Sequence, residues 1–155
     1  MIQKILYAGM FFISAFLFVI TRVLYGLKQK SVKWAGKLRH LSILRKDKTR
    51  KQFIQYFKNK GYQKRVIKFV YRKVQEYINA ADLVLLPEDD FRIVYEVDEA
   101  EWSYSLMDWF EELRRPFPCM EYFLYLNEKY HKVNFEYLME LFDPREKQIS
   151  ANSGI

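Results

Sequence analysis

Few side chains in this sequence are of the types that carry out chemistry in active sites. There are two histidines, His40 and His131, and a single cysteine, Cys119. A histidine can act as a general acid, a general base or a metal ligand, and a cysteine near a helix N-terminus can become a nucleophile. The two histidines are far apart along the chain, and Cys119 has no histidine in its local sequence. We therefore expect structural roles for all three, with Cys119 as a buried thiol.

Carboxylates are the next candidates, because a group of them can bind a divalent cation. They gather between residues 88 and 101, as Glu88, Asp89, Asp90, Glu96, Asp98, Glu99 and Glu101. This run lacks the fixed ligand spacing and the central glycine of a calcium-binding loop. We expect a solvated charged surface and no metal site.

Enzyme motifs are absent as well. The sequence contains no glycine-rich phosphate loop and no H-E-x-x-H, G-x-S-x-G or C-x-x-C pattern. A single cysteine also excludes an internal disulfide and a thiolate cage for zinc or an iron–sulfur cluster. The sequence predicts a protein that is not an enzyme and binds no cofactor.

Length and composition limit the number of domains. A chain of 155 residues has room for one compact domain and an appendage. Hydrophobic residues make up 50% of the chain and aromatic residues 18%, which is enough apolar surface to exclude a chain that is disordered throughout.

The N-terminal segment is the appendage. Residues 5–20 include no charged side chain, and the apolar character continues to Leu27, interrupted at Thr21 and Arg22. A helix over residues 5–27 is about 34 Å long, and a bilayer core is about 30 Å thick. We predict a transmembrane helix over residues 5–27, preceded by a short flank at 1–4. A cleaved signal peptide, a buried core helix and a helix in the membrane plane are the alternatives.

The charge on the C-terminal side of this segment predicts its orientation. Residues 28–51 hold ten Lys and Arg and one acid, Asp47. Lys and Arg resist translocation across the membrane. We therefore predict a single-pass protein of the cell membrane, with its N-terminus outside and its C-terminal domain in the cytoplasm.

The basic juxtamembrane segment, residues 28–51, also predicts a contact with lipid. Cationic side chains beside a span attract anionic headgroups, and Trp favours the interface. An amphipathic helix over residues 27–41 would hold such side chains at the surface. The predicted membrane-surface residues are Arg22, Lys28, Lys30, Lys33, Trp34, Lys37 and Arg39. A topology signal with no other role is the alternative.

Charge divides the remaining chain into two halves of opposite sign. Residues 28–75 hold 17 basic residues and one acid, whereas residues 76–155 hold 18 acids and seven basic residues. The resulting net charges are +16 and −11. Either the two halves dock on each other, or each binds a partner of opposite charge.

Apolar periodicity predicts a mainly α-helical domain over residues 52–147. Helices are expected around 53–57 before Gly61, over 66–81, over 98–113, from Pro118 to Tyr130, and over 135–142. Asp98 and Asn134 have the residue types of N-caps. The small polar end of the chain, residues 148–155, predicts a flexible tail.

A minor β element near residues 83–97 is an open alternative within this fold. Phe, Ile, Tyr and Val occupy every second position from 91 to 97, which is typical of a half-buried strand. A strand needs a partner, and residues 83–86 are the available one. An extended loop packed on helices is the other interpretation.

These features predict an adaptor or accessory protein that touches anionic lipid with its basic segment and a protein partner with its acidic, aromatic part. Two kinds of side chain define the predicted partner-binding set, aromatic anchors and acids. Its members are Trp102, Trp109, Phe110, Asp108, Glu111 and Glu112. The three aromatic residues could instead be core, and the sequence does not indicate an oligomeric state.

Two further functions are alternatives. A membrane-tethered enzyme or carrier domain would assemble its site only in the folded chain. A membrane-tethered nucleic-acid binder would use aromatic side chains that alternate with Lys and Arg, since bases stack on such rings. Those aromatics are Phe53, Tyr56, Phe57, Tyr62, Phe69 and Tyr71. Most of them fall on the apolar stripe of a core, so nucleic-acid binding is the less favoured prediction.

Overall fold

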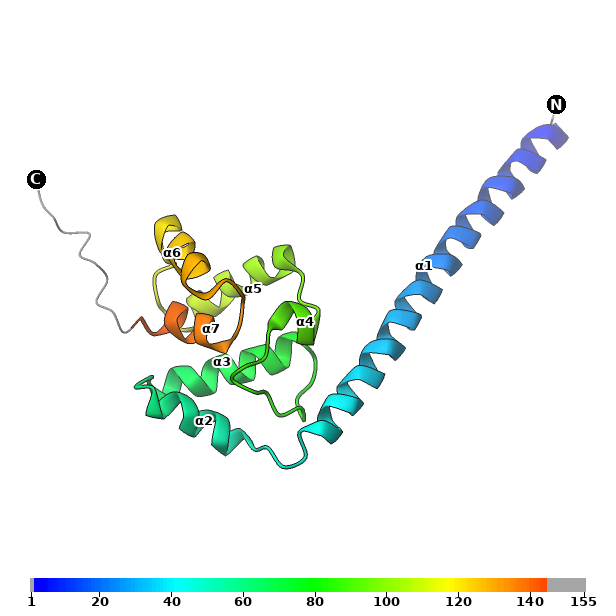
Figure 1. Cartoon of the computed structure of the whole chain (residues 1–155). Helices are drawn as coiled ribbons and strands as arrows, with labels where there is room; N and C mark the ends of the chain where they lie inside the picture. The colour runs from blue at the N-terminus through cyan, green and yellow to red at the C-terminus, as the bar shows by residue number, and fades with distance from the viewer. Residues whose placement is uncertain (1, 145–155) are drawn as a thin grey trace, which may run out of the picture. The chain divides into compact units, whose positions relative to one another are not determined.

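Seven α-helices and no strands make up residues 2–144, which are the residues that this computed structural model describes, with side chains for 16–98 and 101–144 (Figure 1). The mainly α-helical fold class is therefore confirmed. The helices are α1 (Ile2–Leu44), α2 (Arg50–Asn59), α3 (Lys64–Tyr77), α4 (Phe91–Tyr95), α5 (Glu99–Glu112), α6 (Met120–Tyr130) and α7 (Phe135–Phe142). The chain divides into two compact units, one ending at Leu44 and one beginning at Arg45. The predicted tail, 148–155, lies outside the described residues.

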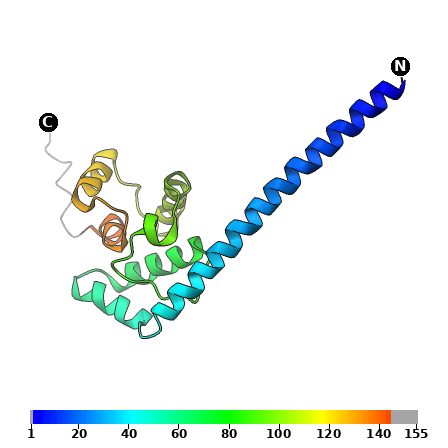
Figure 2. The same cartoon turned by 45° about the vertical axis from the view of Figure 1, so that its right-hand side comes forward.

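Helix α1 is one unbroken helix of 43 residues (Figure 2). The predicted interfacial helix over 27–41 is thus not a separate element, because the helical hydrogen bonding continues through Gly26 and Gly36. Four consecutive side chains, at residues 16–19, are exposed apolar groups, so this part of α1 buries none of its sides. Thr21 donates its hydroxyl to the carbonyl of Leu17 at 2.7 Å, which satisfies this polar group inside the helix.

Among the residues that the structure describes, no helix combines the length and the apolar character needed to cross a membrane. Residues 5–15, the first part of the predicted span, lie outside the residues whose side chains are described.

The second unit closes on a core of aromatic rings. Phe53 of α2 meets Tyr71 of α3 and Phe135 of α7, each with ring centroids 4.8 Å apart and nearly perpendicular planes. Phe91 of α4 meets Phe135 at 4.7 Å. Such edge-to-face pairs are favoured by the ring quadrupoles and bury large apolar areas. The core therefore joins the basic half of the chain to the acidic half.

Side-chain caps begin several of these helices. Thr49 and Gln52 form a reciprocal capping box at the start of α2. The backbone amide of Gln63, the residue before α3, is satisfied from the other end of the domain, because it donates to Asp143 Oδ2 at 2.8 Å. The predicted N-cap Asn134 accepts from the amide of Tyr137 at 2.9 Å. Caps of this kind satisfy backbone amides that have no partner within their helix.

The predicted β element is wrong, because residues 91–95 form helix α4. Asp90 caps this helix by accepting from the amides of Arg92 and Ile93 at 3.0 and 3.3 Å. Phe91 and Tyr95, four residues apart, share the buried face, and Ile93 between them is 74% exposed. Phe91 and Tyr95 therefore fit both the two-residue period of a strand and the four-residue spacing of one helix face. Residues 83–86 are irregular chain and form no strand.

Candidate interaction surfaces

The three aromatic residues predicted to bind a partner belong to the core. Trp102, Trp109 and Phe110 of α5 are each 4–5% exposed. Trp102 packs against Trp109 at 5.1 Å, and Phe110 stacks on Phe142 at 4.4 Å. Their spacing places them on one side of α5, which faces the other helices. The partner-binding prediction is wrong for these residues, and the core alternative describes them.

The predicted acidic members of the set divide between solvent and an ion-pair network. Asp108 and Glu111 are exposed. Glu112 accepts a hydrogen bond from Arg72 Nη2 at 2.6 Å and also pairs with Lys73 of α3. The hydrogen bond from Lys73 lowers the pKa of Glu112, and the same bond raises the pKa of Lys73. Part of the acidic half therefore neutralises part of the basic half.

Other contacts also join the two halves. Glu136 of α7 accepts from the hydroxyl of Tyr56 at 2.9 Å and pairs with Lys60. Asp143 accepts from Gln63 and lies 3.8 Å from Arg115 Nη2. The docking of one half on the other, left open by the sequence, is thus present in the second unit.

Helix α6 presents an apolar face to solvent. Phe117, Met120 and Leu124 are 49%, 70% and 57% exposed. Met120 and Leu124 lie one helical turn apart, and Glu128 comes one turn later on the same side. Phe117, which lies just before α6, packs on Phe110 with ring centroids 5.2 Å apart, so this side chain is held against the core. We call Phe117, Met120 and Leu124 the α6 apolar face.

Carboxylates flank the α6 apolar face. Glu121 and Glu128 are both exposed, and a backbone hydrogen bond at the start of α6 lowers the pKa of Glu121. A large exposed apolar group costs free energy in water, and acids beside it favour a cationic partner. No pattern in the sequence marks this face, because Met, Leu and Phe are also the ordinary residues of a core.

The basic half has the opposite surface, with charge outside and apolar groups inside. Residues 48–75 hold ten basic residues and no acid. Three of them, Lys60, Arg72 and Lys73, pair with the acids described above. The other seven are exposed and have no acidic partner in the described part of the chain; they are Lys48, Arg50, Lys51, Lys58, Lys64, Arg65 and Lys68. We call these seven the basic surface.

The aromatics proposed to stack on bases are mostly unavailable on this surface. Phe53, Phe57, Tyr62, Phe69 and Tyr71 are buried in the core. Tyr56 is 39% exposed, and its hydroxyl donates to Glu136. These six aromatics therefore form no stacking platform for single-stranded nucleic acid on the basic surface.

The predicted membrane-surface residues all lie on α1. Arg22, Lys28, Lys30, Lys33 and Arg39 are exposed. Trp34 and Lys37 are half-buried neighbours, with the Lys37 Nζ 5.7 Å from the centre of the Trp34 ring.

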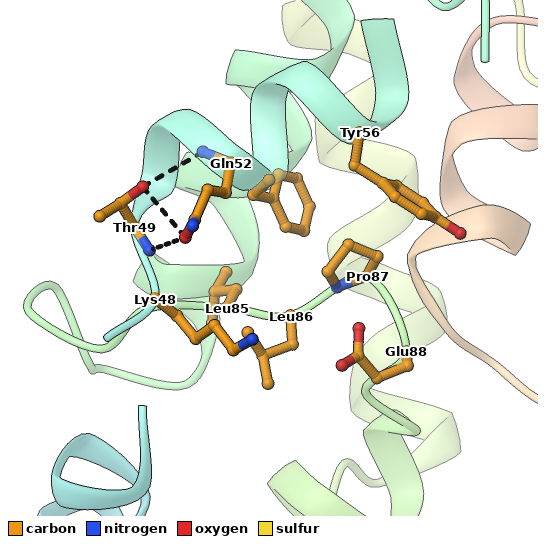
Figure 3. A pocket seen from close by; sticks show the side chains of 9 residues that line it. Lys48, Thr49, Gln52, Tyr56, Leu85, Leu86, Pro87 and Glu88 are labelled. Atoms are coloured by element: carbon orange, nitrogen blue, oxygen red, sulfur yellow. Dashed lines mark hydrogen bonds between the residues drawn. The ribbon is translucent and has the colours of Figure 1, made fainter. Parts of the chain in front are cut away.

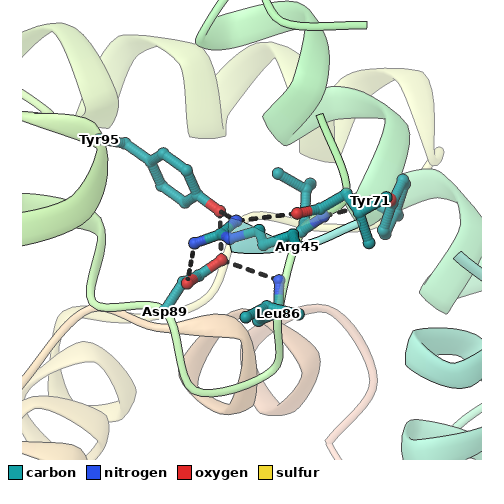
Figure 4. A network of polar contacts seen from close by, with 7 residues as sticks. Arg45, Tyr71, Leu86, Asp89 and Tyr95 are labelled. Atoms are coloured by element: carbon teal, nitrogen blue, oxygen red, sulfur yellow. Dashed lines mark hydrogen bonds and ion pairs between the residues drawn. The ribbon is translucent and has the colours of Figure 1, made fainter. Parts of the chain in front are cut away.

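A buried polar network lies between the turn before α2 and the loop before α4 (Figure 4). Arg45 Nη2 donates to Asp89 Oδ1 at 2.6 Å, and Arg45 Nη1 donates to the Val84 carbonyl at 2.8 Å. Asp89 also accepts from the Leu86 amide at 2.8 Å and from the Tyr95 hydroxyl. Burial raises the pKa of the Asp89 carboxyl, and its hydrogen bonds oppose that rise. The bonds fix the loop.

This network corrects the expectation of a solvated acidic surface over residues 88–101. Asp89 is buried and paired, Asp90 caps α4, and Asp98 accepts from the amide of Glu101 at 3.2 Å. Glu88 is the exposed member of the first three acids. In the described part of the chain, no group of three or more His, Cys, Asp or Glu could hold a metal ion.

The remaining candidates for chemistry do not form a site. Cys119 is exposed at the N-cap of α6, so the prediction of a buried thiol is wrong. His131 ends the same helix with a left-handed backbone at φ 53°. His40 is exposed on α1, which belongs to the other unit.

A shallow cavity of about 270 Å³ lies between the start of α2 and the loop at residues 85–88 (Figure 3). Its lining is mainly apolar, from Phe53, Tyr56 and Leu85 to Pro87. The polar atoms of Thr49 and Gln52 already bond to each other in the capping box. Two charged residues, Lys48 and Glu88, also line the cavity, and both are exposed.

Comparison with known proteins gives no match among protein-family models, curated proteins or solved structures.

Proposed function

We propose that this chain is a membrane-anchored adaptor that holds a protein partner at the α6 apolar face. The exposure of Phe117, Met120 and Leu124 carries the proposal, because these three large apolar side chains lie in water at and just before one helix. Exposed apolar groups fixed on a rigid element are typical of protein-binding surfaces. The exposed acids Asp108 and Glu111 are part of the same half of the domain.

The anchor in this proposal is the segment 5–27 of α1. Residues 5–20 carry no charge, and the side chains described at 16–19 are apolar and exposed on all sides of the helix. Water is a poor environment for such a helix, and a lipid bilayer is a good one. The ten basic residues at 28–51 favour a cytoplasmic location for the domain on their C-terminal side. Anionic lipid is then the neighbour of Arg22 and Lys28.

The anchor is tested by membrane extraction and by reporter fusions. We expect the full chain to stay with membranes at alkaline pH, and a reporter at the C-terminus to be active in the cytoplasm. Release of the full chain as a free protein would contradict the anchor, and an external C-terminus would contradict the orientation.

The partner surface is tested by photo-crosslinking in native membranes. A photoreactive residue placed at Leu124 should give one specific protein adduct, and Met120→Asp should abolish it. A control places the photoreactive residue at Ile93, another exposed apolar position, on α4. The same adduct from Ile93 and Leu124, or an adduct that survives Met120→Asp, would contradict the proposed surface.

A further inference from the structure

The basic surface carries a charge that the protein itself does not neutralise. Its seven cations are exposed. The acids that pair with the other cations of this segment are already engaged, because Glu112 pairs with Arg72 and Lys73, and Glu136 pairs with Lys60. The segment from 48 to 75 contributes no acid of its own. Like charges gathered in this way repel each other, so the surface gains free energy when it meets a dense array of anions.

Helical geometry concentrates part of this charge on one side of α3. Lys64, Lys68 and Arg72 recur every four residues, and Arg65 lies beside them, so all four project within an arc of about 100°. Val66, Val70 and Val74 occupy the opposite side and are buried. Arg72 is held by Glu112, which fixes one end of this row. The three unpaired cations of the row are therefore presented together and outward by a packed helix.

We infer that the basic surface binds the anionic headgroups of the cytoplasmic leaflet and lays the second unit on the membrane. This inference rests on the anchor proposed above, since an anchored domain meets the leaflet at high effective concentration. Ammonium and guanidinium groups complement lipid phosphates and carboxylates without needing a shaped pocket. Each cation near an anionic leaflet strengthens binding about fivefold, so neutralising three weakens docking about a hundredfold.

Nucleic acid is the competing polyanion, and the proposed anchor favours lipid over it. The rings that could stack on unpaired bases are mostly buried. Cations without stacking or base-reading groups give contacts to phosphate alone, which a membrane supplies equally well. If the proposed anchor holds, the membrane is the polyanion to which the domain is tethered.

The single cysteine provides a direct test with the full chain. Cys119 is exposed and is the only thiol, so it can carry a donor fluorophore without any substitution. The labelled chain is placed in nanodiscs of neutral phosphatidylcholine, with or without phosphatidylserine, and headgroup-labelled lipid is the acceptor. We expect energy transfer to change when phosphatidylserine is added and to return to its neutral-disc value at high salt, because these contacts are screened.

A triple substitution tests the residues. In Lys64→Gln/Arg65→Gln/Lys68→Gln, the response to phosphatidylserine should be lost, with the thermal unfolding of the protein unchanged. The control neutralises three exposed cations of the acidic half, Arg92, Arg114 and Lys132, and should keep the response. A response that survives the first triple, or disappears equally in the control, overturns the inference.

The outcomes separate this inference from the proposed function. A chain that does not enter nanodiscs overturns the anchor and with it this inference. A chain that enters but shows no response to phosphatidylserine overturns the inference alone. A competition experiment separates lipid from nucleic acid. Labelled duplex DNA that stays bound to the full chain in the presence of excess phosphatidylserine discs would also overturn the inference, in favour of nucleic acid.

Discussion

The two halves of the second unit use similar residues in opposite ways. Helices α2 and α3 turn most of their rings inward and their cations outward, whereas α6 keeps Leu126 inside and leaves Met120 and Leu124 in water. The first surface acts at long range and weakens with salt, and the second acts only on contact and through desolvation. One small helical core therefore presents two surfaces of different physical character, for which we propose different partners.

The largest loss of stability is expected from a cavity in the core that both halves share. Phe135 is fully buried and contacts Phe53 on one side and Phe91 on the other. Phe135→Ala should lower the free energy of unfolding by about 3–5 kcal/mol, because it leaves a cavity between the halves. Urea denaturation measures the change. A loss below about 1 kcal/mol would mean that the halves are stable separately.

The buried ion pair should have the next largest effect. Arg45→Met leaves the Asp89 carboxylate buried without its cation, at a cost of about 3 kcal/mol. Because burial already raises the pKa of Asp89 above that of the unfolded chain, the folded state binds the proton more tightly. The free energy of unfolding should therefore fall as pH rises from about 4 to the folded pKa, more steeply in the variant.

A control for the ion pair removes the charge of Asp89 together with that of Arg45. Arg45→Met/Asp89→Asn should recover part of the lost stability, since a neutral amide costs less to bury than a lone carboxylate. A double variant that is less stable than Arg45→Met would contradict this account of the network.

A pair of substitutions on one helix makes the contrast within α6 sharper. Leu126 is fully buried, and Leu124, two residues earlier, is 57% exposed. Leu126→Ala should cost about 2–3 kcal/mol of unfolding free energy, and Leu124→Ala should stay within about 0.5 kcal/mol. Thermal unfolding of the two variants is the measurement. Equal losses would show that the α6 apolar face is covered within the protein.

The smallest effect is expected from the ion pair that joins α3 to α5. The pKa of Glu112 is lowered, so its contribution is present above its ordinary value of 4.5 and is lost as pH falls through the folded pKa. The pKa of Lys73 is raised, so its contribution is present below 10.5 and is lost as pH rises through the folded pKa. The stability difference between the protein and Glu112→Gln should vanish at low pH and only shrink at high pH, where Arg72 stays charged and keeps its bond to Glu112. A difference that does not change with pH would exclude the ion pair as its source.

Local signals explain why most helices could be predicted from sequence. The stripe of Val66, Val70 and Val74 on α3 and the N-cap Asn134 both depend on residues that are close together in the sequence. Both have the predicted structure. The amide of Glu101 likewise bonds to Asp98, as the capping pattern predicted. Helix α4 was missed because Phe91 and Tyr95 satisfy the spacing of a strand and of a helix, and the cap by Asp90 decided between them.

The interaction surfaces could be predicted only in part, because exposure is a property of the folded chain. Trp109 and Leu124 are both apolar residues on amphipathic helices, and nothing in their local sequence shows that one is buried and the other exposed. The partnership of Glu112 with Arg72 spans 40 residues, and that of Arg45 with Asp89 spans 44. The excess of cations over residues 48–75 was visible in the sequence, since it needs only counting.

The bond from the Gln63 amide to Asp143 bears on the order of events during synthesis. These residues are 80 positions apart, so α3 remains without this cap until almost the whole described chain has been made. Chains are synthesised from the N-terminus, and a domain folds when its last essential contact becomes available. The segment proposed as an anchor therefore leaves the ribosome long before the domain can close, and membrane targeting would precede folding.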